Sequence, residues 1–177
     1  MPFNTLLLTC LQSTQTVLAD SKTKVLLKGI KTDETVLVFE SDNQSNPRCK
    51  LRKFLWDNQQ GQGLCDFIVF YANDEQRVIC FVELKDNIGD LKKAVNQVVN
   101  TYDAFRQHLT LPYTPKAFIV GQSGSVPQEH NESQGELLAK FGKNNYHHDG
   151  GHSDFLEFLR GTLNPKKDKF KKGRTGR

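Results

Sequence analysis

Three charged side chains stand at the ends of two apolar runs, where charged residues are uncommon. Residues Cys65–Ala72 and Arg77–Lys85 both have the composition of buried strands, with a turn-like stretch between them. Side chains alternate along a strand, so Glu83 and Lys85 lie on one face, about 7 Å apart at ~3.3 Å per residue. If the two strands pair as a hairpin, Asp66 lies beside Glu83 and Lys85. Two carboxylates and an ammonium at one end of a sheet are suited to hold a divalent metal and to activate a water molecule.

A purely structural interpretation of the same residues is an ordinary ion pair between Glu83 and Lys85, worth at most about 1 kcal/mol, with Asp66 as a strand-start residue. The run from Ile79 to Val82 is apolar at every position, which predicts a central strand covered on both faces. Charges at the end of a central strand lie where ligands usually bind. We therefore favour a metal site, or the degenerate remnant of one.

The elements after these strands are well marked. Residues 91–109 are predicted to form a helix, because apolar residues recur every three or four positions along it and Pro112 follows. Residues 116–121 form a short apolar strand, expected to run parallel to its predecessor because a helix makes the crossover. Further helices are predicted over 133–141 and 154–163, and residues 146–152, rich in His and Gly, are predicted to form a loop.

Upstream of Asp66 the pattern predicts three strands. Residues 23–30 and 34–41 are expected to form a hairpin, and residues 49–56 a further strand that leads into the site. From residue 49 the order is then three strands, a helix and a strand. This order predicts an α/β or α+β fold, in which helices flank a mixed β-sheet and an N-terminal β-hairpin extends or covers one edge.

The pattern of Asp66, then Glu83-x-Lys85 closing an apolar strand, then a helix and another strand, resembles the PD-(D/E)XK nuclease superfamily over about residues 50–122. Cys65 stands where that pattern often has a proline. The resemblance implies a restriction endonuclease-like core. It also implies that Asp66, Glu83 and the carbonyl of Leu84 bind Mg²⁺ or Mn²⁺. Lys85 would orient or deprotonate the attacking water and stabilise the phosphate in the transition state.

The resemblance extends to a glutamine and a fourth acid. Nucleases similar to RecB carry a glutamine on the helix after the lysine, with a tyrosine one turn later. Gln97 matches the glutamine, whereas Tyr102 is one position too far and belongs to the apolar stripe of the helix. Some members of the superfamily add an acid from the N-terminal region, for which Asp20 and Glu40 are both candidates.

The positive charge of the chain is concentrated at its C-terminus. The chain has 24 Lys and Arg and 20 Asp and Glu; residues 166–177 hold seven of the former and one of the latter, so the rest of the chain is −2. Residues 1–164 are predicted to form one domain, and 165–177 a basic, disordered tail. The tail, with Lys166 and Lys167, is either a nucleic-acid contact or a solubilising terminus. Lys50, Arg52 and Lys53 are candidates for contact with a phosphate backbone, or for solvated lysines at a sheet edge.

The composition excludes a membrane span, because no apolar run approaches about 18 residues. The N-terminus lacks the basic flank of a signal peptide, and the four cysteines lack CxxC spacing, so a cytoplasmic protein with reduced thiols is expected.

The expected function is a Mg²⁺- or Mn²⁺-dependent endonuclease acting on DNA, in prokaryotic defence or DNA processing. It is expected to act as a homodimer or within a larger complex. The alternatives are an inactive nuclease-fold module that binds nucleic acid or scaffolds a partner complex, and an RNA-directed nuclease.

Overall fold

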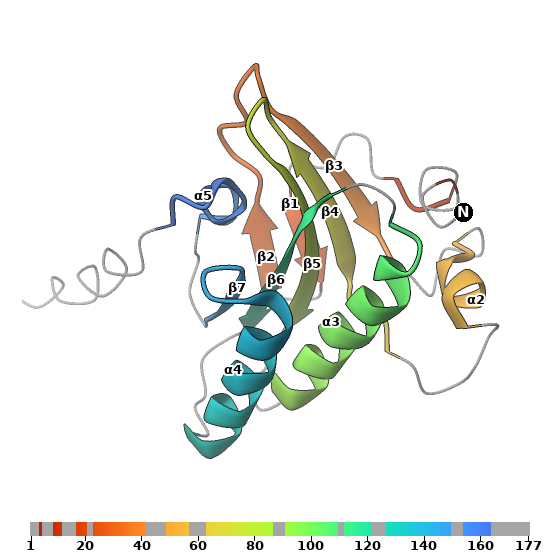
Figure 1. The fold of residues 1–177 in the computed structure, drawn as a ribbon, viewed down its shortest axis with the longest axis vertical. Coiled ribbons are helices and arrows are strands. Elements are labelled where there is room, and N and C mark those ends of the chain that lie inside the picture. The colour runs from red at the N-terminus through yellow and green to blue at the C-terminus, as the bar shows by residue number, and fades with distance from the viewer. Residues whose placement is uncertain are drawn as a thin grey trace, which may run out of the picture.

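The structure, a computed structural model, describes residues 4, 9–11, 17–20, 23–41, 49–56, 63–86, 91–109, 112–121, 127–149 and 154–163. Its centre is a five-stranded mixed sheet (Figure 1). The first three strands are antiparallel, and the last two join in parallel. This arrangement confirms the predicted fold class. In spatial order the strands are β3 (Thr35–Glu40), β4 (Phe67–Ala72), β5 (Arg77–Lys85), β6 (Thr114–Gly121) and β7 (Tyr146–Asp149).

Three helices belong to one face of the sheet. They are α2 (Leu51–Trp56), α3 (Leu91–Arg106) and α4 (Pro127–Phe141). Ile79 and Phe81 of β5 point to this face and pack with the apolar stripe of α3, as the sequence predicts. The helix α3 also connects β5 to β6, which explains why these two strands are parallel.

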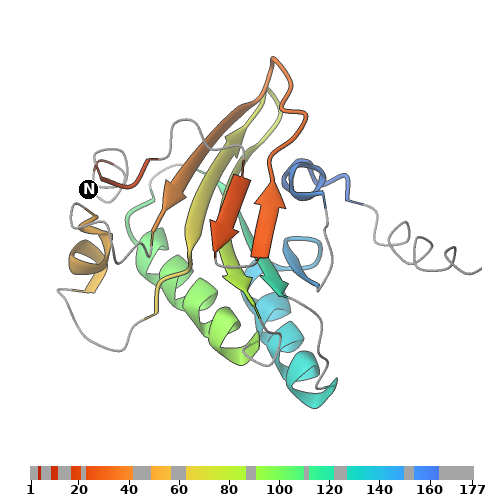
Figure 2. The same ribbon diagram turned by 180° about the vertical axis from the view of Figure 1, so that it is seen from behind.

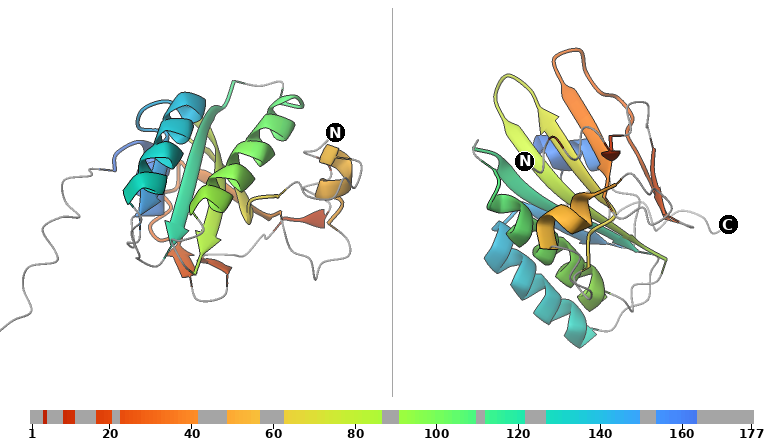
Figure 3. Two further views of the ribbon diagram at one scale, coloured as in Figure 1. Left: turned by 90° about the horizontal axis from the view of Figure 1, so that it is seen from below. Right: turned by 90° about the vertical axis from the view of Figure 1, so that its right-hand side faces the viewer.

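The other face carries a two-stranded hairpin and a short helix (Figure 2). The hairpin consists of β1 (Val17–Asp20) and β2 (Thr23–Leu26), and the helix is α5 (Phe155–Arg160). They pack with Val78, Cys80 and Val82 of β5 in a second core. The sheet therefore lies between two layers (Figure 3), and β5 is buried on both faces as predicted.

The strand predicted over residues 49–56 is wrong, because residues 51–56 form the helix α2. The backbone N–H of Phe54 donates to the carbonyl of Lys50 at 2.9 Å, which closes the first helical turn. Leu51 and Leu55, four positions apart, both pack on the first core. Spacing of this kind suits a helix as well as a strand in so short a run. The first strand of the sheet is β3, not residues 49–56.

An N-terminal hairpin is present, but its strands differ from those predicted. Residues 23–26 pair with β1, whereas residues 35–40 pair with β4. The strand expected over residues 23–30 ends at Leu26, and the chain then turns at Gly29, whose φ of +78° is a left-handed conformation. The predicted hairpin between residues 23–30 and 34–41 is therefore wrong in its pairing.

Three further boundaries differ. The helix expected over 133–141 begins at Pro127, and the one expected from residue 154 is shorter, with Asp154 as its N-cap and Gly161 at its C-terminus. The His-rich segment is not wholly a loop: residues 146–149 form the edge strand β7, and the His147 ring stacks on Phe118 at 4.8 Å.

None of the described helices is long and apolar enough to cross a lipid bilayer. The four cysteines carry free thiols, as expected. Of the predicted tail, Lys166 and Lys167 lie outside the described residues.

A bidentate ion pair fastens α5 to the start of β3. Arg160 donates from Nε and Nη2 to the two carboxylate oxygens of Glu34, at 2.6 and 2.7 Å. The Tyr71 hydroxyl donates to the same carboxylate at 3.0 Å. These bonds hold the pKa of Glu34 down at about 2, with Arg160 as the main cause.

We predict that Glu34→Gln reduces the dependence of stability on acid pH. The folded-state pKa of Glu34, about 2, lies below its ordinary value of 4.5, so the stabilisation is complete above about pH 4.5 and is lost as the pH falls toward 2. The free energy of unfolding, measured with urea between pH 2 and 6, should change less with pH for the variant than for the wild type. Glu75→Gln, in an exposed turn, is the control. The same pH dependence of the free energy of unfolding in Glu34→Gln and in the wild type would contradict the lowered pKa of Glu34.

Candidate metal centre

The carboxylates of Asp66 and Glu83 form hydrogen bonds to backbone groups just beyond the end of the β4–β5 ladder. The last paired residues are Phe67 and Val82. Beyond them the Asp66 carboxylate accepts the N–H of Leu84 at 2.7 Å, and the Glu83 carboxylate accepts the N–H of Asp66 at 3.1 Å. These side-chain hydrogen bonds thus take the place of the next backbone hydrogen bonds between β4 and β5. Charge-assisted bonds of this kind fix the orientation of both carboxylates.

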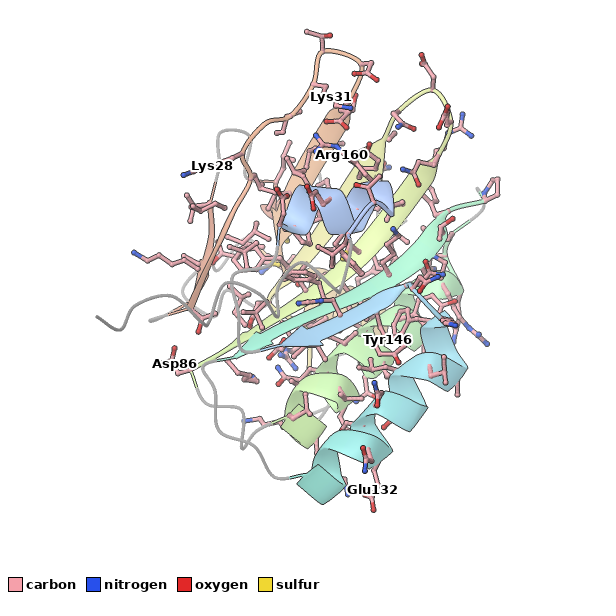
Figure 4. The ribbon with its side chains drawn as sticks, turned by 90° about the vertical axis from the view of Figure 1, so that its left-hand side faces the viewer. Lys28, Lys31, Asp86, Glu132, Tyr146 and Arg160 are labelled. Atoms are coloured by element: carbon pink, nitrogen blue, oxygen red, sulfur yellow. The ribbon has the colours of Figure 1, made fainter. Side chains whose placement is uncertain are left out.

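Lys85 completes the predicted trio. Glu83 and Lys85 project to the face of the sheet that carries α3, and their side chains form an ion pair between Nζ and Oε1. The Glu83 side chain is completely buried, whereas that of Lys85 is 18% exposed. The ammonium therefore lies between a buried carboxylate and solvent, at the end of β5. Asp86, the next residue, marks this end of the sheet in Figure 4.

Gln97 joins the trio from α3, as the sequence predicts. Its Oε1 accepts from Lys85 Nζ at 3.0 Å, and its Nε2 donates to the carbonyl of Leu64 at 2.8 Å. Gly63 lies against it: a Cβ at that position would be 2.6 Å from Gln97 Cγ. Gln97 therefore connects the lysine to the segment 63–66 that carries Asp66.

Two hydroxyls secure the same segment. Thr101 Oγ1 accepts the N–H of Cys65 at 2.9 Å and donates to the carbonyl of Gln97 at 2.7 Å. Ser41 donates from its hydroxyl to the Cys65 carbonyl and from its N–H to the Asp66 carbonyl. The segment thus receives side-chain hydrogen bonds from α3 and from the end of β3 in place of a regular sheet ladder.

Sequence reasoning missed Thr101, Ser41 and Gly63. A signal for Thr101 was available, because it is four positions after Gln97 and therefore on the same side of the helix. Tyr102, in contrast, packs against Phe81 and Phe141 in the core, as its place in the apolar stripe predicts.

The electrostatics of Glu83 favour a nearby positive charge. Burial, and next the negative charge of Asp66, raise the pKa of Glu83 to about 8, even though Lys85 acts in the opposite direction. Glu83 Oε1 is buried and accepts no well-oriented hydrogen bond from the described residues; its charged neighbour is the Lys85 ammonium. A perturbed carboxyl with an under-satisfied oxygen is typical of a functional site.

The donor set fits a hard divalent cation. Carboxylate oxygens of Asp66 and Glu83 converge here, and the Leu84 carbonyl belongs to the residue whose N–H already faces Asp66. The N–H and C=O of one strand residue point to the same neighbouring strand, so this carbonyl faces the gap between β4 and β5. Within the described part of the chain, no group of three or more His, Cys, Asp or Glu side chains is placed to hold a metal ion. The candidate centre therefore has two carboxylates and the Leu84 carbonyl as its protein donors.

Of the two proposed fourth acids, Glu40 does not join the others. It pairs with Phe67, and both Phe67 and Val38 pack in the second core, so Glu40 is on the face of the sheet opposite Glu83. The backbone of Asp20 pairs with Thr23, whose hydroxyl donates to the Lys85 carbonyl at 2.8 Å. The register thus brings the backbone of Asp20 to the same end of β5.

The structure does not bring Lys50, Arg52 and Lys53 to the carboxylates. They lie at or in α2, where the Phe54 ring is 5.0 Å from the His108 ring. His108 is eleven residues after Gln97, or about 16 Å along the direction of α3 at ~1.5 Å per residue. The prediction that these residues lie on a strand leading into the site is therefore wrong, while their contact with nucleic acid stays a prediction.

The chain matches no known family model, no curated protein and no solved structure. The description of the site therefore rests on the geometry of its own residues. The resemblance to PD-(D/E)XK nucleases stays an expectation from the sequence pattern.

We predict that Thr101→Val destabilises the protein by about 1 to 3 kcal/mol, because valine has the same shape but leaves the buried N–H of Cys65 without its acceptor. Thr101→Ser, which retains the hydroxyl, should cost clearly less. Urea unfolding of the two variants measures the difference. Equal destabilisation by Val and Ser would show that the methyl group, not the hydrogen bond, is what matters.

Proposed function

We propose that this protein is a metal-dependent phosphodiesterase that cleaves DNA, most simply as an endonuclease. The observation that carries the proposal is the convergence of Asp66, Glu83, Lys85 and Gln97 at the end of β5. The agreement of these residues with the PD-(D/E)XK pattern supports a nuclease over other metal-dependent hydrolases. Fold alone would not decide between them.

Asp66 and Glu83 would hold Mg²⁺ or Mn²⁺ together with the Leu84 carbonyl. The bound cation would neutralise charge on the phosphate and lower the pKa of water. The protein's own contribution is preorganisation, because the two backbone hydrogen bonds fix both carboxylates before substrate arrives.

Lys85 is the group placed to act on the reacting phosphate. Its ammonium is partly exposed, next to Glu83, and Gln97 Oε1 restricts its position. From there it can orient the attacking water and stabilise the negative charge that develops on the phosphate oxygens. Gln97 is a positioning residue in this scheme, because it acts through Lys85 and through the carbonyl of Leu64.

Cutting both strands of a duplex at one place requires two such sites, which a two-fold dimer supplies. We therefore include a homodimer, or a larger defence complex that contains two copies, in the proposal.

The proposal predicts that Asp66→Asn, Glu83→Gln and Lys85→Met each reduce DNA cleavage at least a hundredfold. These changes remove a proposed ligand charge or the ammonium while keeping the shape of each side chain. Supercoiled plasmid, linear duplex, single strands and RNA should be incubated with Mg²⁺, Mn²⁺ or EDTA, and the products separated on gels.

Glu75→Gln, a carboxylate change in an exposed turn, is the matched control and should cleave like the wild type. Circular dichroism should show that all variants are folded. Full activity in any two of the three site variants would refute the proposal. Cleavage of RNA alone would retain the chemistry and change the substrate.

A further inference from the structure

The exposed side of the β1–β2 hairpin has a regular pattern of basic and apolar side chains. Along β2 and the residue after it, Thr23, Val25 and Leu27 are buried. The residues between them, Lys24, Leu26 and Lys28, are exposed. This alternation is that of a strand with one face on the core and one face in solvent.

The exposed surface extends past the end of β2, where the alternation stops and residues 28–33 are all exposed. Ile30 and Lys31 are both exposed in the segment that leads to β3. Leu26 is 47% exposed and Ile30 is 44% exposed, so two large apolar side chains stand among three lysines. We call Lys24, Leu26, Lys28, Ile30 and Lys31 the hairpin surface. None of its three lysines is part of a salt bridge in the described region.

The hairpin surface begins beside the candidate metal centre. The hydroxyl of Thr23, the first residue of β2, donates to the Lys85 carbonyl at 2.8 Å, so Lys24 is one residue from this contact. From there β2 runs away from the end of β5 (Figure 1). Lys28 and Lys31 lie on the same side of the molecule at increasing distance from Asp86 (Figure 4). The lysines thus form a line that leads outward from the site.

The dimensions and the charge of this line suit a nucleic-acid backbone. Lys24 and Lys28 are four residues apart, about 13 Å at ~3.3 Å per residue. The exposed acid nearest in sequence is Asp33, beyond Lys31 in the following turn. Lysines at such intervals are able to neutralise successive phosphates. Leu26 and Ile30 would add apolar contact with the sugars of a bound strand.

We propose that the hairpin surface binds the phosphate backbone of the DNA flanking the bond that is cut at the end of β5. This inference rests on the proposed function, because it takes the substrate to be DNA. It assigns substrate binding to a surface that lies on the opposite face of the sheet from α3. Contact between Leu26, Ile30 and another protein is the competing interpretation, and the experiment below separates the two.

The test is the salt dependence of binding of a fluorescent 20-base-pair duplex, followed by anisotropy in EDTA so that no cleavage occurs. The triple variant Lys24→Gln, Lys28→Gln, Lys31→Gln should bind more weakly than the wild type. The slope of log affinity against log salt should be shallower by about 2 to 3, since each phosphate contact contributes about 0.9. Circular dichroism should show that the variant is folded.

A second triple variant, Arg77→Gln, Arg106→Gln, Lys143→Gln, removes the same charge from other exposed positions and should keep the wild-type slope. Equal slopes for the hairpin variant and the wild type, or no binding of DNA by the wild type, would overturn the inference. Concentration-dependent association that Leu26→Ser and Ile30→Ser abolish, with an unchanged DNA slope, would assign the surface to a protein partner instead. Binding with the predicted slopes but no cleavage with Mg²⁺ or Mn²⁺ would support DNA binding by the hairpin surface and refute the proposed activity.

Discussion

The burial of the Glu83 carboxylate next to a second carboxylate, that of Asp66, is the constraint on which this site depends. Glu83 is fully buried beside Asp66, and burial together with the like charge of Asp66 raises the pKa of Glu83 and so opposes its ionisation. The chain offsets this cost with a reciprocal exchange, in which each carboxylate accepts a backbone N–H from the neighbouring strand. Lys85 supplies one positive charge, in ion-pair contact with Glu83 Oε1.

The rest of the fold serves to hold that arrangement in place. β5 is covered by α3 on one face and by the hairpin and α5 on the other, so packing on both faces fixes the position of its end. The helix α3 is both the crossover to β6 and the source of Gln97 and Thr101, which reach back to the segment 63–66. One helix therefore positions the lysine and the loop that carries Asp66 together.

The parts of the fold that repeat a clear period could be predicted from the sequence. The apolar runs of β4 and β5, the stripe of α3 and the parallel crossover to β6 were of this kind. Strand alternation and the hairpin also predicted Asp66, Glu83 and Lys85 as neighbours, whereas Gln97 came only from the resemblance to the nuclease superfamily. The strand predicted over residues 49–56 was wrong because apolar residues four positions apart in so short a segment are also compatible with a helix. The pairing of β2 with β1, and of β3 with β4, is a tertiary arrangement that no local pattern reveals. Thr101 and Ser41 act on backbone groups of a loop, and such contacts appear only in three dimensions.

The most direct test of the account is a crystal structure of the protein soaked in Mn²⁺, with anomalous diffraction to locate the ion. The account predicts one strong peak bounded by the carboxylates of Asp66 and Glu83 and the carbonyl of Leu84, and its loss in Asp66→Asn. An ordered structure with no Mn²⁺ between these residues, or with Mn²⁺ bound only elsewhere, would contradict it.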